Sequence, residues 1–198
     1  DLRGKVFGVQ SIGGGFWLQT MVPLESLGLD PDRYQLKMRV IGDTGTVTQA
    51  LIAKMIDAAM LPYSFSDQAK REGLHSLADI GKLKFPFQGN SICFKRDLIV
   101  NSPDLIMSLI KGVIEAVVLI HDPKYKQDVM EIRKKNLRLA KAEDVETSYK
   151  VLQLGATVEV APNMEAWRTI QKVVSRVNPA VRQLDLREVL EGSFVRSL

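Results

Sequence analysis

The sequence predicts an α/β fold in which a mostly parallel sheet is followed by a helical C-terminal part. The first observation is an alternation of strand-like and helix-like apolar segments over residues 5–80, which is the order of βαβ units. The second is a polar, glycine-bearing or proline-bearing turn after each of the first three predicted strands. The third is helical periodicity, with proline at helix starts, in most of the chain after residue 102.

The first predicted strand, residues 5–10, leads into a glycine-rich turn and then into a helix over residues 16–27. The turn contains Ser11, Gly13, Gly14 and Gly15. Glycine permits a tight turn with positive φ, and the first N–H groups of a helix have no acceptor within that helix. Together with the helix dipole, such groups favour an anion or the oxygen-rich end of a ligand. The alternative, which stays open, is that the glycines serve only the steric needs of the connection.

Two more turns follow predicted strands over residues 36–41 and 57–61. The candidate ligand-binding residues in these turns are Thr44, Gly45, Thr46 and Tyr63. Because the carboxyl ends of parallel strands meet at one edge of a sheet, where ligands bind in open α/β folds, we expect all three turns to line one rim. For Thr44 and Thr46 the alternative is that either one caps the following helix, and for Tyr63 it is packing at the surface.

The middle of the chain is expected to hold two further strands and a domain boundary. A fourth strand is predicted over residues 74–80, and an extended strand over residues 91–96 is expected to bury Cys93 as a small hydrophobic residue. Composition changes near residue 89. We therefore expect an α/β lobe over residues 1–90, and a return strand with C-terminal helices over residues 91–198.

The second half is predicted to be mainly helical. Helices are expected over residues 102–120, 122–139, 143–154, 164–177 and 186–191. Ser102 is expected to cap the first of them, with Pro103 at its first helical position. In the earlier helix over residues 16–27, Pro23 is expected to kink or split the helix, because proline lacks the N–H that a helix interior uses.

Composition excludes several classes of protein and site. The 198 residues are 45% hydrophobic and 25% charged, as in an ordinary globular chain. The formal net charge of +4 is compatible with an anionic ligand and too small to indicate nucleic-acid binding. The single cysteine excludes an intrachain disulfide and a cysteine-based metal cluster. The apolar run at residues 105–120 is too short and too charged for a membrane span.

The sequence offers little support for catalysis. His75 and His121 are far apart, and neither has a cysteine or carboxylate at metal-ligand spacing. The sequence also has no serine-centred nucleophile motif. We therefore expect no catalytic residue, no metal site and no cofactor, and the protein is predicted not to be an enzyme.

Several fragments in a fixed order resemble a known family. They are Asp-Leu-Arg-Gly-Lys-Val-Phe-Gly-Val at residues 1–9, Gly-Leu-Asp-Pro at 28–31, Ile-Asp-Ala-Ala-Met at 56–60, Phe-Lys-Arg-Asp at 94–97 and Asn-Ser-Pro-Asp at 101–104. Their order and spacing over about the first 120 residues resemble type 2 solute-binding proteins of ABC importers. The resemblance is strongest to the branch that binds nitrate, sulfonates, taurine or thiamine precursors.

The resemblance implies a fold, a site and a function. Residues 1–90 would be the second lobe of a type 2 periplasmic binding protein, and residues 91–198 would belong to the first lobe, whose N-terminal part is missing before Asp1. Ser11 and the glycines after it match the family's ligand-binding turn. The protein would bind a small anionic or oxygen-rich organic solute between two lobes, without chemistry, and present it to a membrane permease. Its place would be periplasmic or extracytoplasmic, with a membrane anchor as an option in the full-length form.

Two other functions remain as alternatives. The same fold also serves as a ligand-binding module of sensors or regulators. A third hypothesis is an enzyme of thiamine-pyrimidine biosynthesis, although this chain lacks the cysteine-rich signature of those enzymes. The apolar helices after residue 91 are expected either to pack on the lobe that is present or to be covered by a second chain, so self-association is a further expectation.

Overall fold

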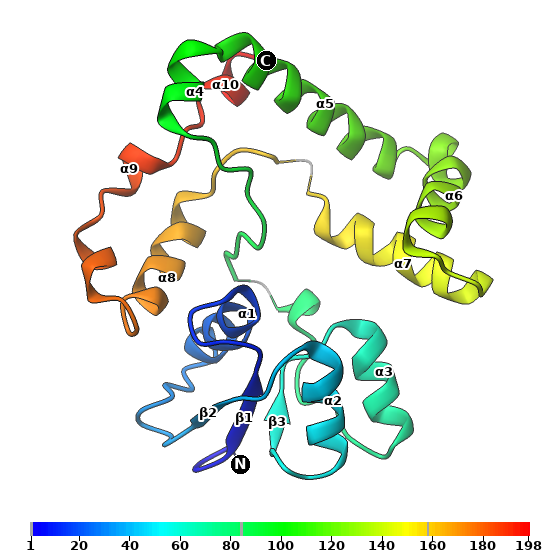
Figure 1. The fold of residues 1–198 in the computed structure, drawn as a ribbon, viewed down its shortest axis with the longest axis vertical. Coiled ribbons are helices and arrows are strands. Elements are labelled where there is room, and N and C mark those ends of the chain that lie inside the picture. Colours follow the sequence, from blue (N-terminus) through cyan, green and yellow to red (C-terminus); the bar gives the residue numbers. More distant parts are fainter. Residues whose placement is uncertain (1, 84, 158) are drawn as a thin grey trace. The chain divides into compact units, whose positions relative to one another are not determined.

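The computed structural model describes residues 2–83, 85–157 and 159–198, and Figure 1 shows the course of the chain. The chain divides into two compact units. The first, here called the sheet unit, comprises Asp1–Ser91 and Asn163–Val189. The second, the helical unit, comprises Ile92–Pro162 and Leu190–Leu198.

The sheet unit contains a small parallel sheet, as the βα alternation predicts. Its strands are β1 (Val6–Val9), β2 (Lys37–Val40) and β3 (Ala58–Ala59), in the spatial order β2-β1-β3. Both neighbours of β1 run parallel to it, and Phe7 pairs with Met38 on one side and with Ala58 on the other. The α/β class is therefore confirmed.

Five α-helices accompany the sheet in the described part of the same unit. They are α1 (Gly15–Ser26), α2 (Thr44–Ile52), α3 (Tyr63–Arg71), α8 (Met164–Val174) and α9 (Leu186–Val189). Two short 3₁₀ helices, η1 (Ile80–Lys82) and η3 (Pro179–Gln183), complete it. The first three α-helices follow the three strands in turn, as expected from the sequence.

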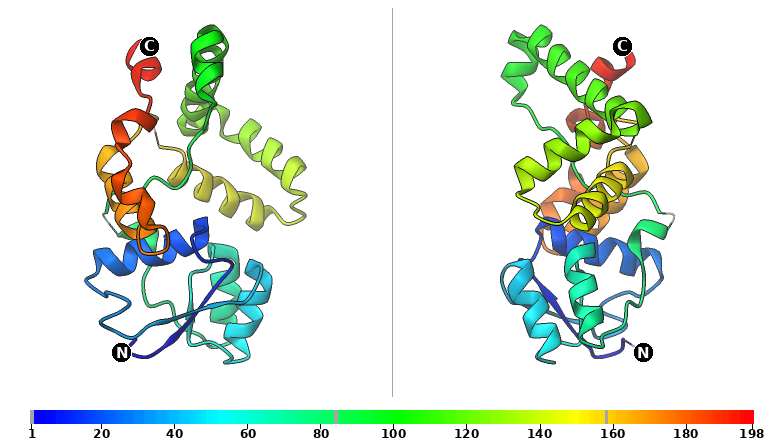
Figure 2. Two further views of the ribbon diagram at one scale, coloured as in Figure 1. Left: turned by 60° about the vertical axis from the view of Figure 1, so that its left-hand side comes forward. Right: turned by 90° about the vertical axis from the view of Figure 1, so that its right-hand side faces the viewer.

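Helices cover both faces of the sheet (Figures 1 and 2). Alternate residues of a strand point to opposite faces. Val9 of β1 accordingly packs with Trp17 and other residues of α1, and with Val173 of α8. On the opposite face, Val6 packs against the buried cluster of α2 that contains Val47. Trp17, which is 3% exposed, belongs to this core.

Gly8 is required by close packing on the α2 face. A Cβ atom at Gly8 would overlap Cδ1 of Ile56 and would lie 3.4 Å from Cγ1 of Val47. Both side chains are almost completely buried. The central strand therefore uses glycine where a neighbouring side chain fills the space above it.

Two strand predictions are wrong, and one of the two outcomes expected at Pro23 does not occur. Pro23 lies within α1 without splitting it, and the N–H of Leu27 still bonds to the Pro23 carbonyl at 2.9 Å. Residues 74–80 form no strand: Ser76 and Asp79 bond to backbone groups two residues away, so the chain turns locally. The predicted strand over residues 91–96 is also absent, since no strand of the described chain pairs with it, and Cys93 is exposed.

The helical unit consists of α4 (Arg96–Asn101), α5 (Pro103–His121), η2 (Pro123–Tyr125), α6 (Lys126–Leu137), α7 (Ala142–Gly155) and α10 (Ser193–Arg196). Figures 1 and 2 show α6 and α7 side by side. The hydroxyl of Tyr149 on α7 donates to the Ile120 carbonyl of α5 at 3.0 Å. Pro103 begins α5 as predicted, but the Ser102 side chain makes no capping hydrogen bond. None of the described helices is long and apolar enough to span a membrane.

Candidate functional site: the rim at the carboxyl edge of the sheet

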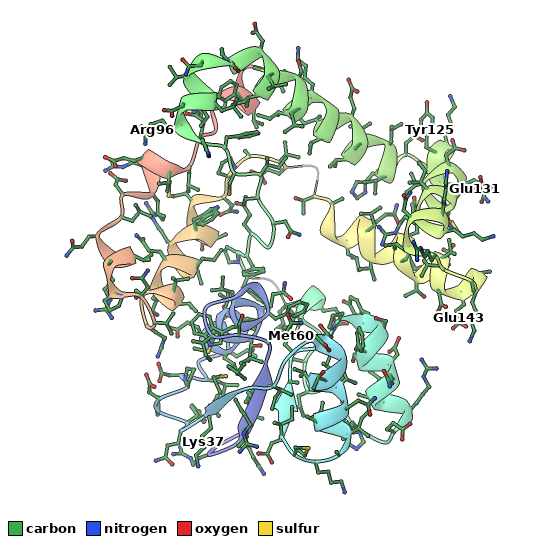
Figure 3. The ribbon with its side chains drawn as sticks, viewed as in Figure 1. Lys37, Met60, Arg96, Tyr125, Glu131 and Glu143 are labelled. Carbon is green, nitrogen blue, oxygen red and sulfur yellow. The ribbon has the colours of Figure 1, made fainter. Side chains whose placement is uncertain are left out.

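The turns after β1 and β2 meet at the carboxyl edge of the sheet, as predicted. Nε2 of Gln10, the residue after β1, lies 2.5 Å from Oγ1 of Thr44, the first residue of α2. Met60, which follows β3, lines the same small hollow as Gln10 and Thr44. In Figure 3, Met60 and Lys37, the first residue of β2, lie at opposite edges of the sheet. We call this carboxyl edge the rim.

The hollow at the rim is small. Its lining residues come from the end of β1, from α1, from α2 and from the residue after β3: Gly8, Val9, Gln10, Phe16, Thr20, Thr44, Val47 and Met60. Its volume of about 10 Å³ has room for about one water molecule. An organic ligand would therefore lie over the rim rather than inside the sheet unit.

The first turn presents unused backbone donors. Gly14 is the N-cap of α1 and offers no side-chain cap, and the first hydrogen bond of the helix runs from the Leu18 N–H to the Gly14 carbonyl at 3.0 Å. The N–H groups of Gly15, Phe16 and Trp17 have no acceptor among the described residues. These three donors, at the positive end of a 12-residue helix, are suited to an anionic group.

The glycines of this turn have identifiable steric roles. Gly13 has a φ of +80°, which is in the left-handed region. A Cβ atom at Gly14 would overlap the hydroxyl oxygen of Ser11. Ser11 itself is exposed, and its hydroxyl lies beside the uncapped helix end. The structure thus supports the steric interpretation of Gly13 and Gly14. Ligand binding by this turn stays a prediction.

The second turn uses most of its polar groups internally. Asp43 caps α2: its Oδ1 accepts the Thr46 N–H at 2.8 Å and the Thr46 hydroxyl at 3.1 Å. The Thr46 N–H is the main cause of the lowered pKa of Asp43. The expectation that Thr44 or Thr46 caps this helix is therefore wrong. Thr44 contacts Gln10 instead. Gly45 lies between the two threonines, and a Cβ atom at this position would lie 3.2 Å from Oδ1 of Asp43.

The third turn positions a tyrosine. Tyr63 is the first residue of α3 and is 37% exposed. Its hydroxyl donates to Oδ1 of Asp79 at 2.8 Å. This hydrogen bond raises the pKa of Tyr63 and lowers the pKa of Asp79. The hydroxyl proton is used by Asp79, so Tyr63 could offer a ligand its ring and the acceptor lone pairs of its hydroxyl.

Sequence reasoning did not single out Gln10 or Asp43 at the rim. Gln10 carries a weak signal, because it is the last polar residue before the glycine-rich turn. Asp43 carries a clearer one, since aspartate immediately before a helix is a favoured N-cap. Asp57 has a structural role, because its carboxylate accepts the Val6 N–H at 2.8 Å and a hydrogen bond from Nζ of Lys5 at 3.2 Å. The first of these bonds is the main cause of its lowered pKa.

Chemistry-bearing residues elsewhere do not assemble into a site in the described part of the chain. No group of three histidine, cysteine, aspartate or glutamate residues there is arranged to hold a metal ion. His121 lies in the helical unit, with Nε2 2.5 Å from the Ala156 carbonyl oxygen. Arg133 of α6 donates to the Ser148 hydroxyl at 2.9 Å.

Comparison of the chain with protein-family models, with curated proteins and with solved structures finds no match.

Proposed function

We propose that this protein is the solute-binding component of an ABC importer and that it binds a small anionic or oxygen-rich organic solute at the rim. The observation that carries the proposal is the uncapped N-terminus of α1 beside Gln10 and Thr44 at the carboxyl edge of a parallel sheet. Ligands bind at this edge in open α/β folds. The order of sequence fragments that resembles type 2 solute-binding proteins supports the same function.

The charge distribution favours the first turn as the place for the anionic group. The N–H groups of Gly15, Phe16 and Trp17 carry the positive end of the helix dipole. Asp43 in the second turn is an ordinary ionised carboxylate at neutral pH, and the hydrogen bonds from Thr46 lower its pKa further. Its negative charge repels an anion and leaves that side of the rim to neutral or donor groups of the solute. A carboxylate, sulfonate or nitrate group would therefore be held by α1.

The size of the hollow favours binding between two surfaces. A volume of about 10 Å³ cannot enclose an organic solute, whereas small-molecule sites bury most of the ligand surface. The solute would need a second surface over the rim, as in proteins that close two lobes around a ligand. Presentation to a permease and an extracytoplasmic location belong to this proposal.

Replacing Gly15 by proline tests the role of the helix donors. Proline is well tolerated at the first position of a helix and removes only the N–H of that residue. Gly14, with φ −80° and ψ 173°, already has the extended conformation that precedes proline. Loss of one hydrogen bond to a charged group corresponds to about 1.5–3 kcal/mol, or roughly 10–100-fold weaker binding.

Ala142→Pro is the matched control, because Ala142 is the exposed first residue of α7 and follows an extended Lys141 that makes no side-chain cap. Thermal shifts would be measured with nitrate, taurine, alkyl sulfonates, pyrimidines, amino acids and aromatic carboxylates. We expect one class to stabilise the unmodified chain and A142P equally, and G15P much less. No response from any class, or equal binding by both proline variants, would contradict the proposal.

A further inference from the structure

The helical unit has almost no hydrophobic core of its own. In the described part of this unit, three hydrophobic residues are buried: Ile106, Val145 and Tyr149. Twelve large hydrophobic residues of the same unit are exposed. A unit of this composition needs another surface to cover its apolar side chains.

The accessible surface area of the chain is also larger than two fully packed units would have. The accessible surface is 13276 Å². Two separate globular domains with the sizes of these units would together expose about 11,000 Å². Contacts between the units can only reduce the total, so the excess of roughly 2,000 Å² belongs to surfaces that a typical domain would bury. A stable protein–protein interface takes about 800 Å² from each partner.

The longest helix of the unit, α5, carries a regular exposed apolar stripe. Its members follow each other at intervals of four, three, four and three residues: Leu105, Leu109, Gly112, Ala116 and Leu119. Leu105 is 60% exposed, Leu109 45% and Leu119 40%. The face next to this stripe turns inward, where Ile106 is 1% exposed. The four–three spacing of the stripe is the pattern of helix surfaces that pack against another helix.

Gly112, at the centre of the stripe, has no explanation within this chain. Apart from its chain neighbours and the backbone of its own helix, no described atom lies within 4 Å of the position that its Cβ would occupy, and its φ is not in the positive region. Glycine inside a helix is less favourable than alanine, so a glycine here weakens α5 without relieving any crowding. A glycine does permit the backbone of another helix to approach closely.

We infer that the exposed stripe of α5 is the contact surface of a homodimer in which the α5 helices of two copies pack antiparallel and cross at Gly112. A second copy fits because the stripe is complementary to itself when reversed. Leu105 then faces Leu119 of the other copy, Leu109 faces Ala116, and the two Gly112 residues meet. Large residues oppose small ones beside the crossing point, and the stripe carries no ionised side chain that would face a like charge. A two-fold axis relates the two copies, as in most homodimers.

The mass of the full chain in solution, measured by sedimentation and light scattering over a wide concentration range without added solute, tests this directly. We expect twice the 22.1 kDa of one chain. A monomer at all concentrations, or an open series of larger assemblies, would overturn the inference. Because no solute is needed, the result is independent of the proposed binding function.

Two variants then locate the surface. Gly112→Leu replaces glycine by a better helix former but fills the crossing point, so we expect the dimer dissociation constant to rise at least tenfold. Leu109→Lys is expected to act in the same direction by placing a charge in the contact. Gly155→Leu, at the exposed end of α7 where a Cβ would also meet no atom within 4 Å, is the matched control. A dimer that both stripe variants leave unchanged would overturn the assignment, and circular dichroism would show that each variant is folded.

Discussion

The close approach of Ile56 to Gly8 predicts a specific coupling between two substitutions in the sheet unit. Gly8→Ala places a methyl group where Cδ1 of Ile56 lies. Ile56 is 4% exposed and β-branched, so it has little room and few rotamers with which to yield. Adding a methyl group to a packed core of this kind lowers the free energy of unfolding by about 1–3 kcal/mol.

The second substitution removes the atom that is in the way. Ile56→Val deletes Cδ1 and by itself lowers the free energy of unfolding by about 0.5–1.5 kcal/mol. In the double variant the alanine methyl takes the space that Cδ1 left. We therefore expect the double variant to be less destabilised than the sum of the two single variants, by roughly 1 kcal/mol or more.

Urea unfolding followed by tryptophan fluorescence suits this measurement. The protein has two tryptophans, and both Trp17 and Trp167 belong to the sheet unit, so their signal reports the unit that carries the substitutions. The four proteins of the cycle would be compared by midpoint and slope. Additive effects of Gly8→Ala and Ile56→Val would refute the reasoning, because they would show that the two groups do not compete for one space.

Two further predictions concern ionised groups. Arg176 donates to Glu25, Asp30 and Asp32 at 2.7–3.1 Å, and Arg176→Met should lower stability at pH 7 by about 1–2 kcal/mol, since the guanidinium is partly exposed. The pKa of Glu25 is lowered mainly by a hydrogen bond from Lys172, and that of Asp30 mainly by the Arg33 N–H, with Arg176 adding to both. The contribution of these two carboxylates to the free energy of unfolding is therefore complete above the ordinary carboxyl pKa of about 4–4.5, and it is lost as the pH falls through their lowered pKa values. Urea midpoints measured from pH 7 to pH 3 should fall less steeply in Arg176→Met than in the unmodified protein. Parallel curves for the two proteins would contradict this prediction. Asp43→Ala removes the N-cap of α2 and should destabilise the sheet unit by about 0.5–2 kcal/mol, whereas Asp43→Asn, which keeps a capping side chain, should destabilise it less. Thermal unfolding of both variants would check this prediction. Equal losses of stability would show that the charge of Asp43, and not its capping bond, is what matters.

Local sequence patterns determined much of the sheet unit. Strand and helix periodicity predicted β1, β2 and the three helices that follow the strands, because polar and apolar residues alternate along each of them with the period of that element. The βα order predicted parallel pairing and therefore brought the turns after the strands to one edge. The same kind of pattern misplaced a strand at residues 74–80, since an apolar segment cannot reveal that Ser76 and Asp79 satisfy their neighbouring backbone groups locally.

At the rim, the sequence located the turns but not the use of their side chains. Thr44 and Thr46 are both suitable N-caps, and only the structure shows that Asp43 takes that place. The bond between Gln10 and Thr44 joins residues 34 positions apart, and that between Tyr63 and Asp79 joins residues 16 positions apart. Such pairings depend on how strands and helices are stacked, and no spacing rule within one element predicts them.

The tertiary structure alone decided which distant segments share a unit. In the sequence α8 follows the helices of the second half, yet it packs on α1 and contributes Val173 to the core of the sheet. Lys172 and Arg176 reach Glu25 across more than 140 residues. The amphipathic pattern of α8 showed that it would be a helix with one buried face, but not against which surface. Local periodicity determines which residues a helix must bury, whereas the partner that buries them is chosen by packing over the whole chain.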